Sequence, residues 1–349
     1  MDPRISIDTL MGLRRVYAHT NAEGPCADGL AAAMLVRDVL PDVELHFVVL
    51  NTNEHEEMEP VPGTLVLDMT PPADRVLDFV REGAVVLDHH DKQRPIVERF
   101  GPRGVFGERG VSGATLAFRH VWLPLKLEAQ RIASGSGVLA DILDGERARQ
   151  AEYAQQFAGL IAIRDTWQTD HVLYARAREL SSTIIMFDDW LTDGSPLDRE
   201  RIDRRVATVG AQLVRAFDAE ARRSAEGAWR FTTSRGTRVA VLHSMRARSD
   251  AADLVKDCDL VVAFEYRTRP RPDYPTLPHG VQMKLSFRAR TEWIHCGRLA
   301  GTFGANGGGH AGAAGCVVDF GAKSRLSEGG NPWAFIQSVL EEPERLGLV

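Results

Sequence analysis

The stretch "GAVVLDHHDKQ" at residues 83–93 places an aspartate and two adjacent histidines directly after a run of apolar residues. Such a run is typical of a buried strand. Two interpretations of Asp88, His89 and His90 are open at this point. They form either a tight turn with surface charge or part of a metal site, and the rest of the sequence decides between them.

The composition is that of an ordinary globular protein with room for two domains. The chain has 349 residues, of which 44% are hydrophobic and 26% are charged. The net charge of −6 argues against a broad basic surface for long nucleic acids, because such binding relies on neutralising many phosphates. A short anionic ligand held in one local pocket is compatible with this charge.

The four cysteines lie far apart and form no CxxC pair. This spacing predicts reduced thiols in a cytosolic protein rather than a disulfide framework or a zinc knuckle. The N-terminal segment has no apolar core of signal-peptide length, and no run of about eighteen apolar residues occurs. We therefore expect a soluble, cytoplasmic protein with no membrane partner.

The first ninety residues alternate between short β-rich runs and amphipathic helices, which indicates crossover units and a parallel sheet. Helical patterns dominate from about residue 112 to 225, and the last of them is highly charged with one apolar stripe. Strand patterns return after residue 228. Predicted strands cover 14–19, 44–50, 64–69, 84–88, 237–244, 258–267 and 281–290, with predicted helices at 29–40, 73–83 and 249–257 and a Pro-rich loop at 269–280.

These patterns predict an α/β protein in three parts. Residues 1–190 are expected to form a domain built on a parallel, Rossmann-like sheet. Residues 191–225 are expected to form a connecting helix or linker. Residues 226–349 are expected to form a smaller, mixed α/β domain.

Polar side chains follow several of the predicted strands, at the edge where ligands bind to an open parallel sheet. His19 ends the first strand and is followed by Asp28, Asp68 ends the third strand, and residues 88–90 end the fourth. Asp165 in "AIRDTW" is a further candidate. Each residue alone is explained by an ordinary role such as a helix N-cap, but those roles would have to recur along one sheet edge.

A mixed set of imidazoles and carboxylates suits one or two divalent cations, manganese or a comparable ion, better than a thiolate-rich zinc site does. Two such ions about 3.5–4 Å apart activate a water and stabilise phosphoryl oxygens, as phosphate ester hydrolysis requires. Asp68 on a central strand is well placed to bridge the ions. His90, behind the ligand His89, is positioned to bond the phosphate or to protonate a leaving group.

The second informative stretch is "GTFGANGGGHAGAAGCVV" at residues 301–318. Its glycines allow backbone N–H groups to approach an anion closely. A flexible linker is the alternative, but the apolar strand "AAGCVVDF" follows at once. On the preceding strand, Arg288 and Arg290 point to one face. Arg288 is a candidate for a forked bond to phosphate, while for Arg290 that role and a solvent-facing position both stay open.

"LDHH" together with "GGGHAGAAG" resembles the DHH phosphoesterase superfamily, in the branch with a C-terminal DHHA1 domain. That branch includes nanoRNases, single-strand exonucleases and cyclic-dinucleotide phosphodiesterases. The resemblance covers nearly the whole chain. It implies an N-terminal DHH domain that holds the catalytic metal site and a C-terminal DHHA1 domain that binds the substrate.

The resemblance also implies roles for particular residues and a cofactor. The cofactor is Mn²⁺, with two divalent cations expected and Mg²⁺ or Co²⁺ as alternatives. Asp141 in "VLADILDG" competes with Asp165 for the last ligand position. The implied metal ligands are His19, Asp28, Asp68, His89 and Asp165, the implied catalytic pair is His90 and Asp88, and the implied substrate-binding residues are Arg288, Gly307, Gly308, Gly309 and His310.

The first motif departs from the family pattern. It reads "HTNAEGPCADG", which is longer than expected, with Cys26 where the first aspartate of the family stands. "CADG" is similar to a Cys-x-Asp-Gly found in a subset of the superfamily. Substitution by Glu23 and weaker binding of one metal both stay open. We interpret Cys26 as a small, apolar-tolerant residue beside the site rather than a redox nucleophile.

The leading prediction is a metal-dependent phosphodiesterase that hydrolyses short oligonucleotides, or linear or cyclic dinucleotides, to mononucleotides. The alternatives are an inorganic-pyrophosphatase-like hydrolase of phosphoanhydrides and a nucleotide-binding protein with a degenerate metal site. The expected partner is a short nucleic acid or dinucleotide substrate, and a homodimer is left open. Phe303 and, more weakly, Tyr274 are the aromatic candidates for base stacking.

Overall fold

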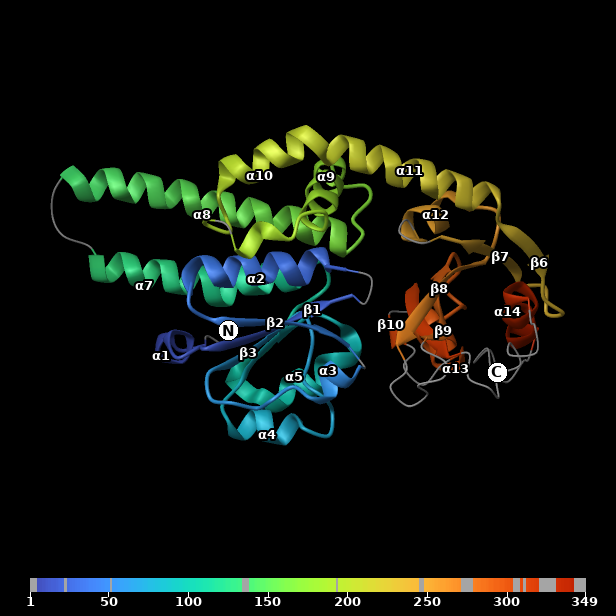
Figure 1. The fold of residues 1–349 in the computed structure, drawn as a ribbon, viewed down its shortest axis with the longest axis horizontal. Helices are drawn as coiled ribbons and strands as arrows, with labels where there is room; N and C mark the ends of the chain where they lie inside the picture. Colours follow the sequence, from blue (N-terminus) through green and yellow to red (C-terminus); the bar gives the residue numbers. More distant parts are fainter. Residues whose placement is uncertain are drawn as a thin grey trace. The chain divides into compact units, whose positions relative to one another are not determined.

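The computed structural model divides into two compact units, Met1–Val214 and Arg215–Val349, and each is described by itself. The division falls within the segment 191–225 that the sequence suggests as a connection. Figure 1 shows the elements of both units. The structure describes residues 5–21, 24–50, 52–133, 138–192, 194–244, 248–270, 279–303, 308–309, 312–319 and 331–341.

The sheet of the first unit is wholly parallel, with the strand order β2-β1-β3-β4-β5. The four strands predicted in the first ninety residues are all present. The three-residue strand β5 was not predicted, because it is too short to show a pattern. The strands are β1 Arg15–Thr20, β2 Glu44–Val49, β3 Thr64–Leu67, β4 Val85–Asp88 and β5 Gly104–Phe106.

Both faces of this sheet are buried, which explains why its central strands read as uninterrupted apolar runs. Successive side chains of a strand point to opposite faces. Leu65 and Leu67 therefore belong to the hydrophobic cluster on one face, while Val66 between them belongs to the cluster on the other. The same alternation separates Val16 from Tyr17 on β1.

Helices cover the two faces of the sheet, with α2 on one side and α4 and α5 on the other (Figure 1). The predicted helix at 73–83 is shorter in the structure. The charged pattern before the second unit forms a continuous helical stretch, because a π-helical turn at Val206–Gly210 joins α10 to α11. The helices are α1 Ile7–Met11, α2 Ala27–Val39, α3 Asn53–Glu56, α4 Val76–Arg81, α5 Arg94–Val97, α6 Gly113–Ala117, α7 Leu123–Ala133, α8 Val138–Asp165, α9 Tyr174–Ile184, α10 Arg199–Arg205 and α11 Ala211–Glu226.

The strand order reverses at β1. The chain passes from β1 to β2 on one side and then returns to place β3, β4 and β5 on the other. In open parallel sheets, ligands bind outside the carboxyl ends of the strands at such a reversal. The topology therefore directs attention to the residues that follow β1, β3 and β4.

The second unit is built on a six-stranded mixed sheet in the order β10-β11-β9-β8-β7-β6. β7 and β8 are parallel, and the other pairs are antiparallel. The mixed α/β character predicted for this part is confirmed. Its elements are β6 Trp229–Thr232, β7 Arg238–His243, α12 Arg248–Leu254, β8 Leu260–Pro270, β9 His279–Ala289, α13 Cys296–Phe303, β10 Gly308–Gly309, β11 Ala313–Asp319 and α14 Pro332–Glu341.

Both predicted boundaries of the loop at 269–280 are wrong. β8 continues to Pro270 and β9 begins at His279, and these two residues are paired across the ladder. A proline is tolerated at a strand terminus, where the missing N–H breaks little pairing. Residues 271–278 lie outside the described part of the chain, as does Tyr274.

The prediction that Phe303 stacks on a substrate base is wrong. Phe303 is 8% exposed and belongs to the hydrophobic core between the sheet and helices α13 and α14. Its ring lies 5.2 Å from that of Phe287 and 6.2 Å from that of Phe335, measured between centroids. Its aromatic surface is therefore used for packing.

All four cysteines are free thiols, and three of them, Cys258, Cys296 and Cys316, are buried in the second unit. Within the described ranges, no helix combines the length and the apolar character needed to cross a bilayer.

Candidate metal centre

Five of the side chains singled out in the sequence come together at the carboxyl edge of the parallel sheet. His19 lies near the end of β1, Asp68 follows β3, and His89 follows β4, and these three strands are neighbours. Asp28 is the second residue of α2, and Asp165 is the last residue of α8. The helices thus bring two more carboxylates to side chains that the strands already hold.

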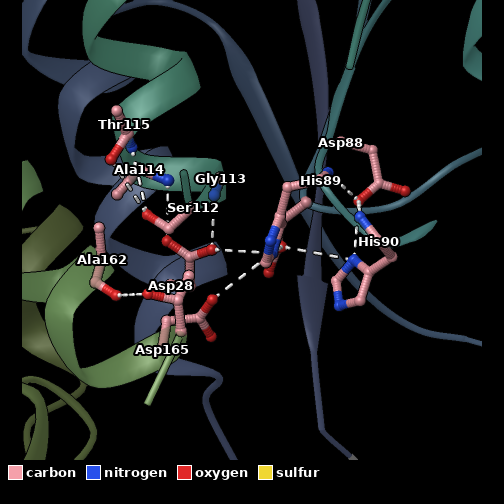
Figure 2. A network of polar contacts seen from close by, with 12 residues as sticks. Asp28, Asp88, His89, His90, Ser112, Gly113, Ala114, Thr115, Ala162 and Asp165 are labelled. Atoms are coloured by element: carbon pink, nitrogen blue, oxygen red, sulfur yellow. Dashed lines mark hydrogen bonds and ion pairs between the residues drawn. The ribbon is translucent and has the colours of Figure 1, made fainter. Parts of the chain in front are cut away.

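His89 lies at the centre of three carboxylates, as Figure 2 shows for Asp28 and Asp165. Its Nε2 atom lies 3.1 Å from Oδ1 of Asp68, 3.6 Å from Oδ2 of Asp28 and 3.5 Å from Oδ2 of Asp165. Asp28 and Asp68 are each 1% exposed. Such a density of buried negative charge requires a compensating cation.

Asp68 stands between two groups of donor atoms. Its Oδ1 faces His89, while its Oδ2 lies 3.4 Å from Nδ1 of His19 and 3.9 Å from Sγ of Cys26. The backbone of Asp68 is left-handed, with φ of 58°, although its N–H still donates to the carbonyl oxygen of Leu87. This conformation is uncommon for an aspartate and is found where a site over-determines the backbone.

Asp28 is held by the start of α6. The backbone N–H groups of Gly113 and Ala114 donate to its two carboxylate oxygens at 2.6 and 2.8 Å, and Ser112 caps the same helix through Thr115 (Figure 2). The positive end of the helix supports the negative charge. This contact was not predicted from the sequence, although "SGAT" contains its signal, a capping serine followed by small residues.

Two glycines allow the close approach of the elements that carry the site. A Cβ atom on Gly113 would lie 2.7 Å from Cβ of Asp68 and 3.0 Å from Oδ2 of Asp28. A Cβ atom on Gly29 would lie 2.1 Å from the carbonyl oxygen of His19. Neither contact is sterically possible without displacement of backbone or ligand side chains.

His90 and Asp88 form a separate pair beside this cluster. Nδ1 of His90 lies 2.7 Å from Oδ1 of Asp88, and the same oxygen accepts the backbone N–H groups of His89 and His90. Asp88 is fully buried, whereas the side chain of His90 is 40% exposed. Burial lowers the pKa of His90, but the charge and hydrogen bond of Asp88 outweigh it, so this pKa is raised.

The charges of the cluster shift its pKa values in opposite directions. Burial, reinforced by Asp68, raises the pKa of Asp28 and of Asp165. For Asp68 the effect of burial is outweighed by the neighbouring His19 and His89, which lower its pKa. For His89, burial lowers the pKa, but Asp68 overcomes this and raises it to about 11. An imidazolium therefore holds the carboxylates together in the absence of a metal.

The residues present fit a divalent cation. Carboxylate oxygens and imidazole nitrogens are the donors preferred by manganese and comparable ions. The Nδ1 atom of His19 is buried and makes no hydrogen bond to the described residues, as is expected of an atom that serves as a ligand. Three groups of candidate ligands occur, and within each group the ligand atoms lie within 4.8 Å of one another. The groups are Asp28, His89 and Asp165; His19, Cys26 and Asp68; and Asp68, Asp88, His89 and His90.

The two candidates for the last aspartate are separated by the structure. Asp141 precedes Asp165 by 24 residues of the same helix, α8, which corresponds to about 36 Å along its axis. Only Asp165 lies at the cluster. Glu23, the proposed substitute in the first motif, lies outside the described residues.

The substrate-binding residues predicted from the glycine-rich stretch belong to the second unit. Arg288 on β9 donates to Oγ of Ser249, and Arg290 pairs with Asp253 on α12 at 3.1 Å. Both arginines face the α12 side of the sheet, as the strand alternation predicts. Gly308 and Gly309 form β10 and pair with β11, while Gly307 and His310 lie outside the described part.

Trp167 was not predicted to contribute to the site. It follows Asp165 by two residues and has a left-handed backbone with φ of 57°. The guanidinium of Arg164 lies 4.1 Å from the centroid of its ring. Within the described ranges, Asp68 and Trp167 are the non-glycine residues with positive φ. Backbone strain of this kind is common at functional sites, and it cannot be predicted from a residue pattern.

No model of a known protein family matches the sequence, and no curated protein is similar to it. Among solved structures, a DHH-domain member of the s1p family of ribosomal proteins superposes with a TM-score of 0.55 at 11% identity, covering 95% of this chain and 88% of that one. The chain therefore shares its fold with this DHH-domain protein.

Two further solved structures match with a TM-score of 0.39. One is a pGpG-specific phosphodiesterase from Vibrio cholerae, 14% identical, with 90% of this chain and 97% of that one covered. The other is an exopolyphosphatase-related protein from Bacteroides fragilis, 12% identical, with 95% and 93% covered. The assignment of the fold rests on the structure with the higher TM-score.

Proposed function

We propose that the chain is a metal-dependent phosphodiesterase that hydrolyses short oligonucleotides or dinucleotides, linear or cyclic, to mononucleotides. The observation that carries this proposal is the meeting of His19, Asp68 and His89 at the reversal point of a parallel sheet. Asp28 and Asp165 complete the set from two helices. Binding of manganese, with magnesium and cobalt as alternatives, belongs to the same proposal.

The ligand set divides around Asp68, whose two oxygens face different donor groups. Asp68 would hold two divalent ions, one together with His19 and the other with His89, Asp28 and Asp165. Bound divalent ions supply a water of lowered pKa and stabilise charge on the phosphoryl oxygens. The α6 terminus keeps Asp28 in place, and burial of the carboxylates preserves their geometry.

His90 is the proton donor of the proposal. Asp88 fixes the ring through Nδ1 and raises the pKa of the imidazole, which favours the protonated form, with a proton on Nε2. That N–H is suited to donate to a phosphoryl oxygen, or to the leaving oxygen as the ester bond breaks. Asp88 acts through His90 and is a positioning residue.

The net charge of the chain favours a short substrate. The net charge of −6 disfavours a long polyanion, whereas one or two phosphates need only local compensation. In the second unit, Arg288 and the glycines of residues 307–309, with His310, are proposed to bind the terminal phosphate and nucleotide. Support for this comes from the fixed guanidinium of Arg288 on β9 and from backbone N–H groups that glycines leave accessible.

The test is hydrolysis of a labelled RNA dinucleotide with manganese. We expect the native chain to release mononucleotides and both Asp68→Asn and His89→Ala to lose at least about a hundredfold in kcat/KM, because removal of a direct metal ligand exceeds the loss typical of a supporting residue. Asp42→Asn is the matched control, since Asp42 is exposed and precedes β2 at the opposite edge of the sheet.

The outcomes separate the alternatives. Turnover of pyrophosphate without turnover of any dinucleotide would favour a phosphoanhydride hydrolase. Metal-dependent nucleotide binding without turnover of any of these substrates would favour a nucleotide-binding protein. Equal activity of the native chain and both site variants would refute the assigned site.

A further inference from the structure

Cys26 occupies a helix N-cap without serving as a cap. It precedes α2 with φ of −77° and ψ of 129°, and its side chain makes no capping hydrogen bond. Serine, threonine, aspartate and asparagine are the residues that stabilise such a position. The thiol is directed instead toward Asp68, with Sγ 3.9 Å from Oδ2. The first turn of α2 therefore gains nothing from this side chain.

Packing does not explain Cys26 either. A buried cysteine usually behaves as a small apolar side chain, and Cys258, Cys296 and Cys316 all belong to hydrophobic clusters. Within the described ranges, Cys26 belongs to none of these clusters. Its sulfur lies within 4.8 Å of a ring nitrogen of His19 and of a carboxylate oxygen of Asp68, both of metal-ligand type.

The two distances known within this group lie within about 0.3 Å of those around a single tetrahedral ion. Nδ1 of His19 lies 3.4 Å from Oδ2 of Asp68, and the sulfur lies 3.9 Å from the same oxygen. Zinc holds nitrogen and oxygen at about 2.0–2.1 Å and sulfur at about 2.3 Å, so its tetrahedral ligand atoms stand about 3.3–3.6 Å apart. Nδ1 of His19 is buried and lies near Asp68 without completing a hydrogen bond to any described residue, which independently points to a ligand at this position.

We infer that Cys26 is a metal ligand and makes the His19 side of the centre selective for a softer divalent ion, Zn²⁺ or Co²⁺, over Mn²⁺. The inference rests on the proposed metal centre and goes beyond it, because the two halves differ in chemistry. His19, Cys26 and Asp68 form a mixed nitrogen, sulfur and oxygen set, whereas Asp28 and Asp165 offer only oxygen beside His89. On coordination the S–H bond is replaced by a sulfur–metal bond, and the proton leaves to solvent.

Cobalt absorption of the full chain tests this assignment. We expect the metal-free native chain to acquire a near-ultraviolet thiolate-to-cobalt charge-transfer band when Co²⁺ is added. Cys26→Ser and Cys26→Asp should both lose the band while still binding cobalt in the calorimeter. His89→Ala should keep it, because the thiolate belongs to the other half of the centre. Competition titrations should show that Cys26→Asp lowers the preference for Zn²⁺ over Mn²⁺ at least tenfold.

The possible results distinguish failure of this inference from failure of the proposed metal centre. A band that persists in Cys26→Ser would arise from another thiol and would overturn the inference. Cobalt binding by the native chain without the band would also overturn it, while the proposed metal centre would stand. Absence of binding of cobalt, zinc and manganese to the native chain would refute the proposed metal centre together with this inference.

Discussion

The site gathers three carboxylates around one imidazole, and their mutual repulsion is reduced by a positive charge. The imidazolium of His89 faces three carboxylates, and burial still raises the pKa of Asp28 and Asp165. Function and stability therefore conflict at these positions, as is common where a site is preorganised for a ligand. The conflict is measurable one residue at a time.

Asp165→Asn is expected to stabilise the metal-free protein at neutral pH. Burial raises the pKa of Asp165 in the folded state, so its ionisation favours unfolding, and stability falls as pH rises from the ordinary aspartate pKa of about 3.9 through the raised value. Removing the ionisation should raise the free energy of unfolding at pH 7. The difference should vanish toward pH 3.

Chemical denaturation at several pH values, with a chelator present, measures this effect. The order should reverse with manganese, since the native chain then gains binding free energy that the variant lacks. A variant that is less stable than the native chain in chelator at pH 7 would show that Asp165 contributes to folding through contacts rather than strain.

Strands and helices bring these residues together, and sequence patterns predict the strands better than the short elements. The strands end where their apolar runs end, so His19, Asp68 and His89 could be assigned to one sheet edge from pattern alone. β5 is too short to show a period, and although Ser112 in "SGAT" marks the start of α6, its approach to Asp28 is a tertiary contact that the sequence does not display. The support of Asp28 by Gly113 and Ala114 was therefore missed.

Other features depend on tertiary context that one sequence does not display. The left-handed backbone of Asp68 and Trp167 arises from the surrounding structure. Phe303 looked available because it borders the glycine-rich stretch, but α13 directs it into the core. Cys26 was expected beside the site, but only the fold shows that its sulfur lies near Asp68.

The start of α6 is expected to be intolerant of a single methyl group. Gly113→Ala should destabilise the protein by about 1–3 kcal/mol, because the new Cβ overlaps Asp68. It should also weaken manganese binding at least tenfold, since Asp28 and Asp68 must move. Thermal denaturation and calorimetric titration measure the two effects.

Gly159→Ala is the matched control for this substitution. Gly159 lies within α8, and a Cβ there meets nothing within 4 Å. Alanine should stabilise this helix by about 0.5–1 kcal/mol and leave metal affinity unchanged. Equal behaviour of the two variants would mean that the close packing at α6 does not control the site.

At the scale of the whole molecule, the two units carry separate cores, and the proposed metal ligands all belong to the first unit. Manganese alone should therefore stabilise the first unit selectively. At a hundredfold excess over its Kd, a ligand stabilises the species that binds it by about 2.7 kcal/mol. This free energy corresponds to about a hundredfold slower hydrogen exchange for amides that exchange through unfolding of that unit.

Hydrogen exchange with and without manganese tests this division. Protection should increase in the segments after β1, β3 and β4 and at the start of α6. Exchange across β7, β8 and β9 should stay unchanged, and His89→Ala should show no response. An equal increase of protection in both sheets would contradict a metal site contained in the first unit.

The most direct test of the central claim is a calorimetric titration of the metal-free chain with manganese. We predict saturable binding to the native chain and to Asp42→Asn, and affinity at least about a hundredfold lower for His89→Ala and for Asp68→Asn. Absence of binding to the native chain, or equal affinity in all four proteins, would contradict the claim that this sheet edge is a metal centre.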